Sequence, residues 1–200
     1  MSVEIVAIND VDKTQLKHFL GVPYDLYRGQ GAWHPPLRFE RSHQISRSKN
    51  PNAHDLDRQL FIARRGSDVV GRIAAFINPQ HRERYQDEAG HFGYFDCEAD
   101  EATGAALLQA AEVWLRNKGV KKIIGPSSHS VNEESGLLVD GFEYPNVLMM
   151  PYGRPDYMEM IDKAGFQKAI DLLAYRADLA SGFTPGPFMR RLNKIVDSLK

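Results

Sequence analysis

The chain has 200 residues, of which 42% are hydrophobic and 26% are charged. This is ordinary globular usage, so a mainly disordered chain is excluded and one domain with a sizeable core is expected. Lys and Arg total 25 against 26 for Asp and Glu, and a net charge of -1 argues against a nucleic-acid or anionic-membrane partner.

The single cysteine, Cys97, cannot form an internal disulfide bond, which fits a reducing compartment. Residues 1–4 show neither the basic stretch nor the apolar segment that begins a signal peptide. The longest clear apolar run, residues 73–77, is much shorter than a membrane span. We therefore expect a cytoplasmic protein with no membrane partner.

The first third of the chain predicts a strand, a helix and a long irregular segment. Residues 3–8 alternate apolar and charged side chains, as a strand does, and residues 12–20 carry apolar residues at helical spacing. Residues 28–58 are rich in Pro, His and Arg and predict a long loop or a broken helix. Loops of this length in compact domains are often functional.

The middle of the chain predicts a hairpin, a strand, a helix and a short strand. Two strand-like runs, 60–64 and 69–77, flank Gly66-Ser67-Asp68 and indicate a β-hairpin, and the aromatic run 90–97 indicates a further strand. Asp100 is the expected N-cap of a helix that ends at Gly119. One face of this helix carries Leu107, Leu108, Ala111, Trp114 and Leu115. A short strand at 122–124 stops at Gly125-Pro126.

After a polar stretch, a second helix is predicted from Pro155 to Gly165, followed by a strand at 169–176. This order of elements implies an α/β (α+β) mixed sheet with helices on both faces. We expect the early strands to be antiparallel and the strands at 90–97 and 121–125 to splay apart. Residues 1–182 form the predicted domain.

Residues 183–200 are predicted to be a linker and a C-terminal amphipathic helix that opens at Pro187. Its apolar stripe consists of Phe188, Leu192, Ile195, Val196 and Leu199. So short a helix is marginal alone in water and needs a surface to pack on. The stripe either pairs with another copy, making a homodimer, or folds back on residues 1–182.

Several short motifs accompany this order of elements. They are Lys49-Asn50-Pro51, Val70-Gly71-Arg72-Ile73-Ala74, His91-Phe92-Gly93-Tyr94-Phe95, Gly125-Pro126, Asn132-Glu133-Glu134-Ser135-Gly136-Leu137-Leu138, Asp140-Gly141-Phe142 and Ala164-Gly165-Phe166. Together, over residues 28–176, the chain resembles a little-characterised bacterial group of GNAT-like (N-acetyltransferase) proteins, which are typically longer and have a second GNAT-like half. The resemblance implies a GNAT-like acyl-CoA N-acyltransferase fold and transfer of an acyl group from acyl-coenzyme A to an amine of a small molecule.

In GNAT enzymes a glycine-rich turn after the fourth strand binds the coenzyme A pyrophosphate at a helix start. The resemblance therefore points to Phe95, Cys97 and Gly104 as cofactor-binding positions. The equivalent turn here, residues 96–104, contains four carboxylates and one glycine. Because acidic side chains repel a pyrophosphate but suit a structural helix cap, the turn predicts weak binding of coenzyme A.

Many GNAT enzymes carry a catalytic tyrosine four residues before a Gly-Phe pair, and Ile161 stands there. Tyr157, one turn earlier on the same face, is either a substitute proton donor or a core residue. Glu133 and Glu134 are either general bases for an amine or part of a solvated acidic loop. Asn132 and Tyr152 are the predicted substrate-binding residues.

His129 is either a base or a plain loop histidine, since no acid partner is evident in the sequence. Cys97 is expected to be an inert strand-end thiol, because Asp96 and Glu98 raise its pKa. Seven histidines without close ligand spacing predict no metal site. Two functions stay open: acyl transfer, or a non-catalytic GNAT-like module that binds a ligand or a partner.

Overall fold

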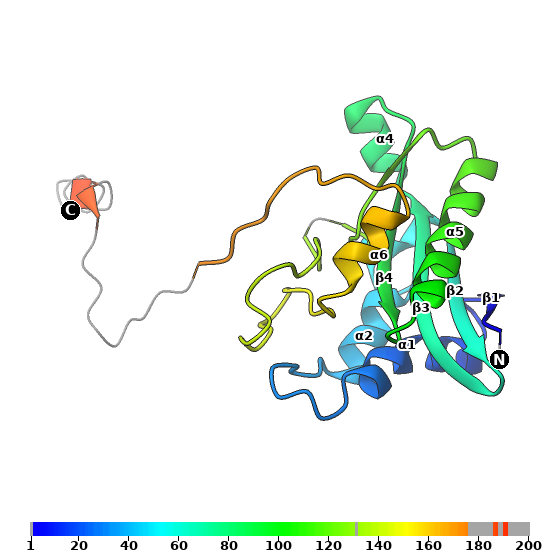
Figure 1. The fold of residues 1–200 in the computed structure, drawn as a ribbon. Helices are drawn as coiled ribbons and strands as arrows, with labels where there is room; N and C mark the ends of the chain where they lie inside the picture. The colour runs from blue at the N-terminus through cyan, green and yellow to red at the C-terminus, as the bar shows by residue number, and fades with distance from the viewer. Residues whose placement is uncertain (1, 131, 176–185, 188–189, 192–200) are drawn as a thin grey trace. The chain divides into compact units, whose positions relative to one another are not determined.

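The computed structural model describes residues 2–130, 132–175, 186–187 and 190–191. The chain divides into two compact units, Met1–Gln167 and Lys168–Lys200. All the helices and strands labelled in Figure 1 belong to the first unit. Within the described residues, no helix combines the length and the apolar character needed to cross a membrane.

A five-stranded sheet lies at the centre of the described part of the first unit. Its strands stand in the order β1 (Glu4–Ile8), β2 (Asp57–Arg65), β3 (Asp68–Ile77), β4 (Ala89–Cys97) and β5 (Lys122–Ile124). The first four pair antiparallel, and β5 pairs with β4 in parallel. The predicted mixed sheet is confirmed, including the hairpin that turns at Gly66, where φ is 63°.

Side chains that alternate along β2 and β3 bury both faces of the sheet, because successive residues of a strand point to opposite sides. Phe61 and Ile73 pack in one core with α5 (Glu101–Asn117) and α6 (Tyr157–Lys163), which Figure 1 shows on the same side of the sheet. On the other face, residues such as Ile62 pack with α1 (Lys13–Leu26). The prediction of helices on both faces is therefore confirmed.

Three of the four predicted helix ends are confirmed, whereas α6 begins at Tyr157, two residues after the predicted start at Pro155. The Asp100 side chain accepts a hydrogen bond from the Thr103 N–H and caps α5. Gly119 and Gly165 have φ values of 76° and 89°, the left-handed conformation that glycine adopts at helix C-termini. Local sequence signals thus set the start of α5 and the residues that follow α5 and α6.

Residues 28–58 form a broken helix, one of the two predicted alternatives. It contains α2 (Arg38–Ile45) and α3 (Pro51–His54), and the side chain of Asn50 caps the second by accepting from the Asn52 N–H. Helix α4 (Pro79–Tyr85) was not predicted, because it has no buried face to give it a hydrophobic period.

The strand predicted at 169–176 is wrong over the residues that the structure describes, since 169–175 form no strand. Ile170, Leu172, Leu173 and Tyr175 are exposed there, so apolar composition alone did not supply the neighbouring strand that pairing requires. Farther on, Pro187, Arg190 and Arg191 are helical, as predicted. The apolar stripe and the homodimer based on it lie outside the described residues.

Candidate active site

The candidate site lies beside the part of β4 that extends past the end of β5. β5 pairs only with Ala89–His91, whereas β4 continues to Cys97, which gives the opening that the sequence predicts between these strands. The chain beyond β5 passes very close to Gly93, where an added β-carbon would lie 1.6 Å from the Ser127 carbonyl oxygen. Glycine at position 93 is therefore required for this crossing.

A pocket opens beside this part of β4. Its walls come from α1, from residues 33–41, from β3 and β4, from residues 126–138, from residues 146–152 and from the start of α6. Seven of the lining residues are aromatic, namely Tyr24, Tyr27, Trp33, Tyr94, Phe95, Tyr152 and Tyr157. Two arginine–carboxylate pairs, Arg72 with Asp96 and Arg41 with Glu134, supply the charge. Aromatic and apolar walls with a few placed polar groups are typical of small-molecule sites.

The deeper pair is buried and belongs to a continuous polar network. Arg72 donates to Asp96 Oδ2 at 2.7 Å from Nε, and Tyr27 donates to Asp96 Oδ1 at 2.5 Å. The Tyr27 and Tyr157 hydroxyl oxygens lie 3.1 Å apart. Every polar group is therefore paired, as a buried ion pair requires.

The Tyr157 hydroxyl also contacts the backbone of β4. It accepts from the Cys97 N–H at 2.8 Å and lies 2.9 Å from the Cys97 carbonyl oxygen, to which it can donate. Burial and the nearby Asp96 carboxylate raise the pKa of Tyr157 well above its usual value. The phenol therefore stays protonated and can donate a hydrogen bond, but it is a weak acid, and its full burial matches the core residue that was one of the two predicted alternatives.

The second pair lies nearer the solvent. The Arg41 guanidinium donates to Glu134 Oε1, and the two side chains are 19% and 25% exposed. Both residues line the pocket. Glu134 is thus a carboxylate in contact with the space that a substrate would occupy.

Glu133 faces away from the pocket lining and holds three amide side chains. Its Oε1 accepts from Asn50 at 2.8 Å and from Asn52 at 3.3 Å, and its Oε2 accepts from Gln44 at 2.9 Å. These contacts tie the loop around residue 133 to the α2–α3 segment. A carboxylate occupied in this way is poorly placed to take a proton from a substrate.

Asn132 and Tyr152, the predicted substrate-binding residues, lie in different places. Asn132 is exposed and its N–H donates to the Ser130 hydroxyl, whereas Tyr152 lines the pocket. The Tyr152 ring stands edge-on to Tyr27 at 5.0 Å, and its hydroxyl donates to Gln30 at 2.8 Å.

His129 is buried and has the acid neighbour that the sequence did not reveal. Its Nδ1 lies 3.7 Å from Glu133 Oε2, and its Nε2 lies 3.1 Å from a guanidinium nitrogen of Arg58. Burial and the positive charge of Arg58 lower the pKa of His129 to about 4, so the ring is neutral near pH 7. Since His129 is fully buried outside the pocket lining, a structural role fits it best.

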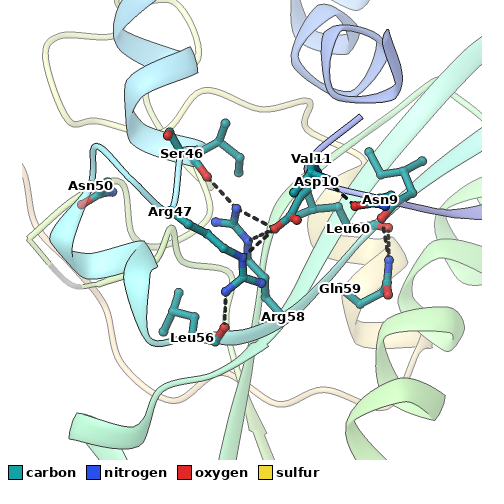
Figure 2. Close-up of polar contacts among 12 residues, drawn as sticks. Asn9, Asp10, Val11, Ser46, Arg47, Asn50, Leu56, Arg58, Gln59 and Leu60 are labelled. Atoms are coloured by element: carbon teal, nitrogen blue, oxygen red, sulfur yellow. Dashed lines mark hydrogen bonds and ion pairs between the residues drawn. The ribbon is translucent and has the colours of Figure 1, made fainter. Parts of the chain in front are cut away.

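Figure 2 shows the polar cluster that holds Arg58 in place. Asp10 accepts from Arg47 at 2.8 Å and from Arg58 at 2.9 Å, and Arg47 also donates to the Leu56 carbonyl at 2.6 Å. Burial alone would raise the pKa of Asp10, but the hydrogen bonds from the two arginines outweigh it and lower the pKa. The cluster fastens the turn after β1 to the segment between α2 and β2.

Only one of the three predicted cofactor-binding residues faces the pocket. Phe95 lines it, whereas Cys97 and Gly104 are buried beneath α6, where the Met160 sulfur lies 3.8 Å from the Cys97 sulfur. An added β-carbon at Gly104 would lie 2.7 Å from the Met160 sulfur, so the close packing of α5 against α6 explains this glycine. Burial and Asp96 raise the pKa of the Cys97 thiol, which agrees with an inert cysteine.

The carboxylates of the acidic turn after β4 are paired with basic side chains from β2 and α6. Arg65 pairs with Glu98 at 2.6 Å and with Asp100 at 2.7 Å, and Lys163 pairs with Glu101 at 2.7 Å. Asp100 also caps α5, and hydrogen bonds from Thr103 lower the pKa of Asp100. The residues at this helix start therefore do not fit a pyrophosphate, because Asp100 occupies the position that the anion would need.

The described residues contain no group of three or more His, Cys, Asp or Glu side chains that could hold a metal ion. Sequence reasoning missed Arg41, Arg72 and Tyr27 as site residues. The only signal for this part of the pocket was the length of the 28–58 segment, which supplies Trp33 and Arg41.

Two curated proteins align with nearly the whole chain. Protein YghO of Escherichia coli (strain K12) is 42% identical over 193 residues, which are 95% of this chain and 47% of that protein. A bacterial ceramide synthase of Caulobacter vibrioides (strain NA1000 / CB15N) is 38% identical over 187 residues, or 92% of this chain and 48% of that protein. The chain spans about half the length of these relatives. No family model matches the chain.

Solved structures establish the fold. A putative acetyl transferase from Pyrococcus furiosus superposes with a TM-score of 0.53 at 13% identity, covering 88% of this chain and 100% of that one. The aminoglycoside acetyltransferase AAC(6')-Iy, bound to a bisubstrate analogue of coenzyme A, has a TM-score of 0.51 at 16% identity over 89% and 99%. The chain thus has the mixed α/β fold of GNAT acetyltransferases.

Proposed function

We propose that this chain is an N-acyltransferase that moves an acyl group from a thioester to the amine of a long-chain amino alcohol. The observation that carries the proposal is the pocket beside the unpaired end of β4, with aromatic walls and a carboxylate in its lining. The relationship to a bacterial ceramide synthase supports the choice of acceptor, because a ceramide is by definition an amide of a long-chain amino alcohol.

The pocket suits both ends of such an acceptor. Its aromatic and apolar side chains, including Trp33, Leu137 and Met150, can cover a hydrocarbon chain, and burial of apolar area favours binding by about 25 cal/mol per Å². The Glu134 carboxylate can accept a hydrogen bond from the amine group. A strongly polar acceptor such as an aminoglycoside would leave many of its own groups unpaired against these walls.

The proposed reaction needs no group beyond the two substrates and the protein. The neutral amine attacks the thioester carbonyl carbon, a C–N bond forms, and the C–S bond breaks to release a thiolate. Glu134 takes the proton from the nitrogen through Oε2, since Arg41 bonds to Oε1. The thiolate takes up the proton that Glu134 then releases to the solvent, which restores the carboxylate. Tyr157, whose raised pKa keeps its phenol protonated, can donate a hydrogen bond to the departing sulfur.

The acyl donor is either acyl-coenzyme A or an acyl group on a carrier protein. The closed turn at residues 98–104 disfavours a grip on the coenzyme A pyrophosphate, so we propose that binding of the donor depends on its acyl and thioester part. Donors that share this part should then be used alike, whatever group carries the thiol.

The test is an acyl-transfer assay with the full chain in detergent micelles, read by mass spectrometry of the amide. Long-chain amino alcohol, glucosamine 6-phosphate and an aminoglycoside are each offered with acetyl-coenzyme A, palmitoyl-coenzyme A and a palmitoylated carrier protein. Amide formed from the amino alcohol well above a heat-denatured control supports the proposal. Product from the polar amines alone contradicts the acceptor, and no product from any pair favours the non-catalytic module.

A further inference from the structure

Exposed apolar side chains lie on two segments that help to form the walls of the pocket, residues 28–41 and 138–154, here called the two loops although the first ends in the first turn of α2. They are Leu37, Phe39, Val139, Tyr144, Val147, Leu148 and Met149, here called the apolar rim, with exposures from 50% for Met149 to 85% for Leu148. Their chain neighbours Pro36, Leu138 and Met150 line the pocket itself. The apolar rim therefore continues the apolar lining outward to the surface.

The two loops are held together by hydrogen bonds of the Asn146 backbone and side chain. Asn146 donates its N–H to the Ala32 carbonyl at 3.3 Å, and its side chain accepts from the His34 N–H at 2.7 Å. The apolar side chains are thus free to face the solvent while the loops stay in place.

The tip of the second loop is a turn that polar residues and glycine would suit better. The Met150 N–H donates to the Val147 carbonyl at 3.0 Å, and Met149, at the third position of the turn, has a φ of 64°. Glycine or asparagine is favoured there, because a residue with larger side chain is strained in the left-handed conformation. Leu148 stands beside it almost wholly in water. Both choices oppose the stability of a free surface turn, so a contact outside the chain accounts for them.

We propose that the apolar rim inserts into the interface of a lipid bilayer, so that the acceptor can pass from the bilayer into the pocket. The proposal rests on the proposed function, because a long-chain amino alcohol resides in the bilayer. The rim adjoins Pro36, Leu138 and Met150 of the pocket lining, so a bilayer that covers the rim would also lie next to the pocket. Binding to a bilayer interface grows with the apolar area buried at the headgroup boundary, and tyrosine is enriched at that boundary.

The charges of the two loops distinguish insertion of apolar side chains from electrostatic binding to anionic lipids. Residues 28–41 and 138–154 carry Arg28, Arg38, Arg41 and Arg154 against Glu40, Asp140 and Glu143. Arg28 and Arg41 are further paired with Asp25 and Glu134. The loops thus offer little net charge to anionic lipids, and binding should occur on uncharged phosphatidylcholine and change little with salt.

The experiment is flotation of the full chain with phosphatidylcholine vesicles. The test variant is Leu148→Asn/Met149→Gly, which removes two apolar side chains and relieves the backbone strain at 149, so folding is preserved. The matched control is Leu172→Asn/Leu173→Gly, at residues that are 65% and 73% exposed in the other unit. We expect the wild type and the control to float alike and the test variant to partition about tenfold less.

Four results would overturn the proposal. They are a wild type that does not float, a test variant that floats as well as the wild type, binding that requires phosphatidylserine and disappears in about 0.5 M NaCl, and a lipid-free dimer that the test variant converts to a monomer. The last would identify a second copy as the occupant of the rim. The micellar assay keeps the two proposals apart: amide formation without flotation refutes only the inference, and flotation without amide formation refutes only the proposed function.

Discussion

Glu133 and Glu134 are neighbours in the chain, yet they serve different parts of the molecule. The side chain of Glu133 is 12% exposed and holds the amides of Gln44, Asn50 and Asn52, whereas that of Glu134 is 25% exposed and lines the pocket beside Arg41. One carboxylate fixes a loop to its scaffold and the other meets the space for a substrate. A pair of adjacent acidic residues therefore identifies a region of interest but not the residue that can react.

The largest effect on stability is expected for the buried pair of Arg72 and Asp96, because these side chains both line the pocket and stabilise the fold. Asp96→Ala leaves Arg72 buried without its carboxylate and should lower the free energy of unfolding by about 3 to 5 kcal/mol. Urea denaturation measures the change. Glu112→Ala, which breaks the exposed pair with Arg116, is the control and should cost less than about 0.5 kcal/mol. If Asp96→Ala lowered the free energy of unfolding by less than about 1 kcal/mol, the buried network would not contribute to stability as proposed.

The comparison of the two glutamates is tested directly by Glu133→Gln and Glu134→Gln. In Glu133→Gln the new NH2 group would face the NH2 group of Gln44 or Asn50, and two donors cannot form a hydrogen bond. The substitution should therefore lower the free energy of unfolding by about 2 to 3 kcal/mol. Glu134→Gln should cost less than about 1 kcal/mol but lower the rate of amide formation about a hundredfold, in line with the loss of a general base. The division would be refuted if Glu133→Gln lowered the rate at unchanged stability while Glu134→Gln stayed active.

His129, which lies beside Glu133, should make the stability of the fold depend on pH. His129 and His91 are buried with pKa values lowered to about 4, against 6.5 for an ordinary histidine, so the unfolded chain binds protons that the folded chain does not. Their contribution is complete above pH 6.5 and is lost as the pH falls toward 4. Between pH 6.5 and 5 the free energy of unfolding should fall by about 2 kcal/mol from each group at most.

The control for that pH series is His129→Phe, which removes one of the two titrating rings and should flatten the dependence by roughly half. Thermal denaturation across the same range provides an independent measurement. A stability that rises on acidification, or a slope that the substitution leaves unchanged, would contradict the assignment.

The smallest effect concerns the acidic turn, a third region where carboxylates serve structure. We expect the full chain to bind acetyl-coenzyme A with a dissociation constant near or above about 1 mM in isothermal titration, about -4 kcal/mol. Asp100→Asn keeps the helix cap and removes one negative charge, so affinity should improve only a few-fold, about 1 kcal/mol. Micromolar binding by the wild type would show that backbone amides suffice despite the closed turn.

The elements that the sequence predicted correctly depend on short-range signals. Asp100 and Gly119 flank a helix whose apolar residues recur at helical spacing, and the hairpin turns at Gly66. The strand prediction at 169–176 is wrong over the described residues 169–175, because a strand needs a neighbouring strand to pair with and no local pattern encodes that neighbour. Helix α4 was missed because it buries no residue.

The site was predicted only in part, for a related reason. Glu134, Tyr152, Tyr157 and Phe95 do line the pocket, but the sequence could not show which glutamate faces it. The contacts that decide this join residues far apart in the sequence: Arg41 and Glu134 are separated by 93 positions, and Asn50 and Glu133 by 83. Gly104 was assigned to a cofactor because a turn glycine and a packing glycine look the same until Met160 is placed against it.

Asn146 gives the mouth of the pocket a property that neither loop has alone. It is bonded to the backbone at Ala32 and His34, 112 residues from the latter in sequence. The two loops are consequently coupled, because moving one away from the other breaks these hydrogen bonds. The walls that both loops give the pocket therefore depend on one asparagine, and an insertion that displaces Asn146 from Ala32 and His34 would alter both walls.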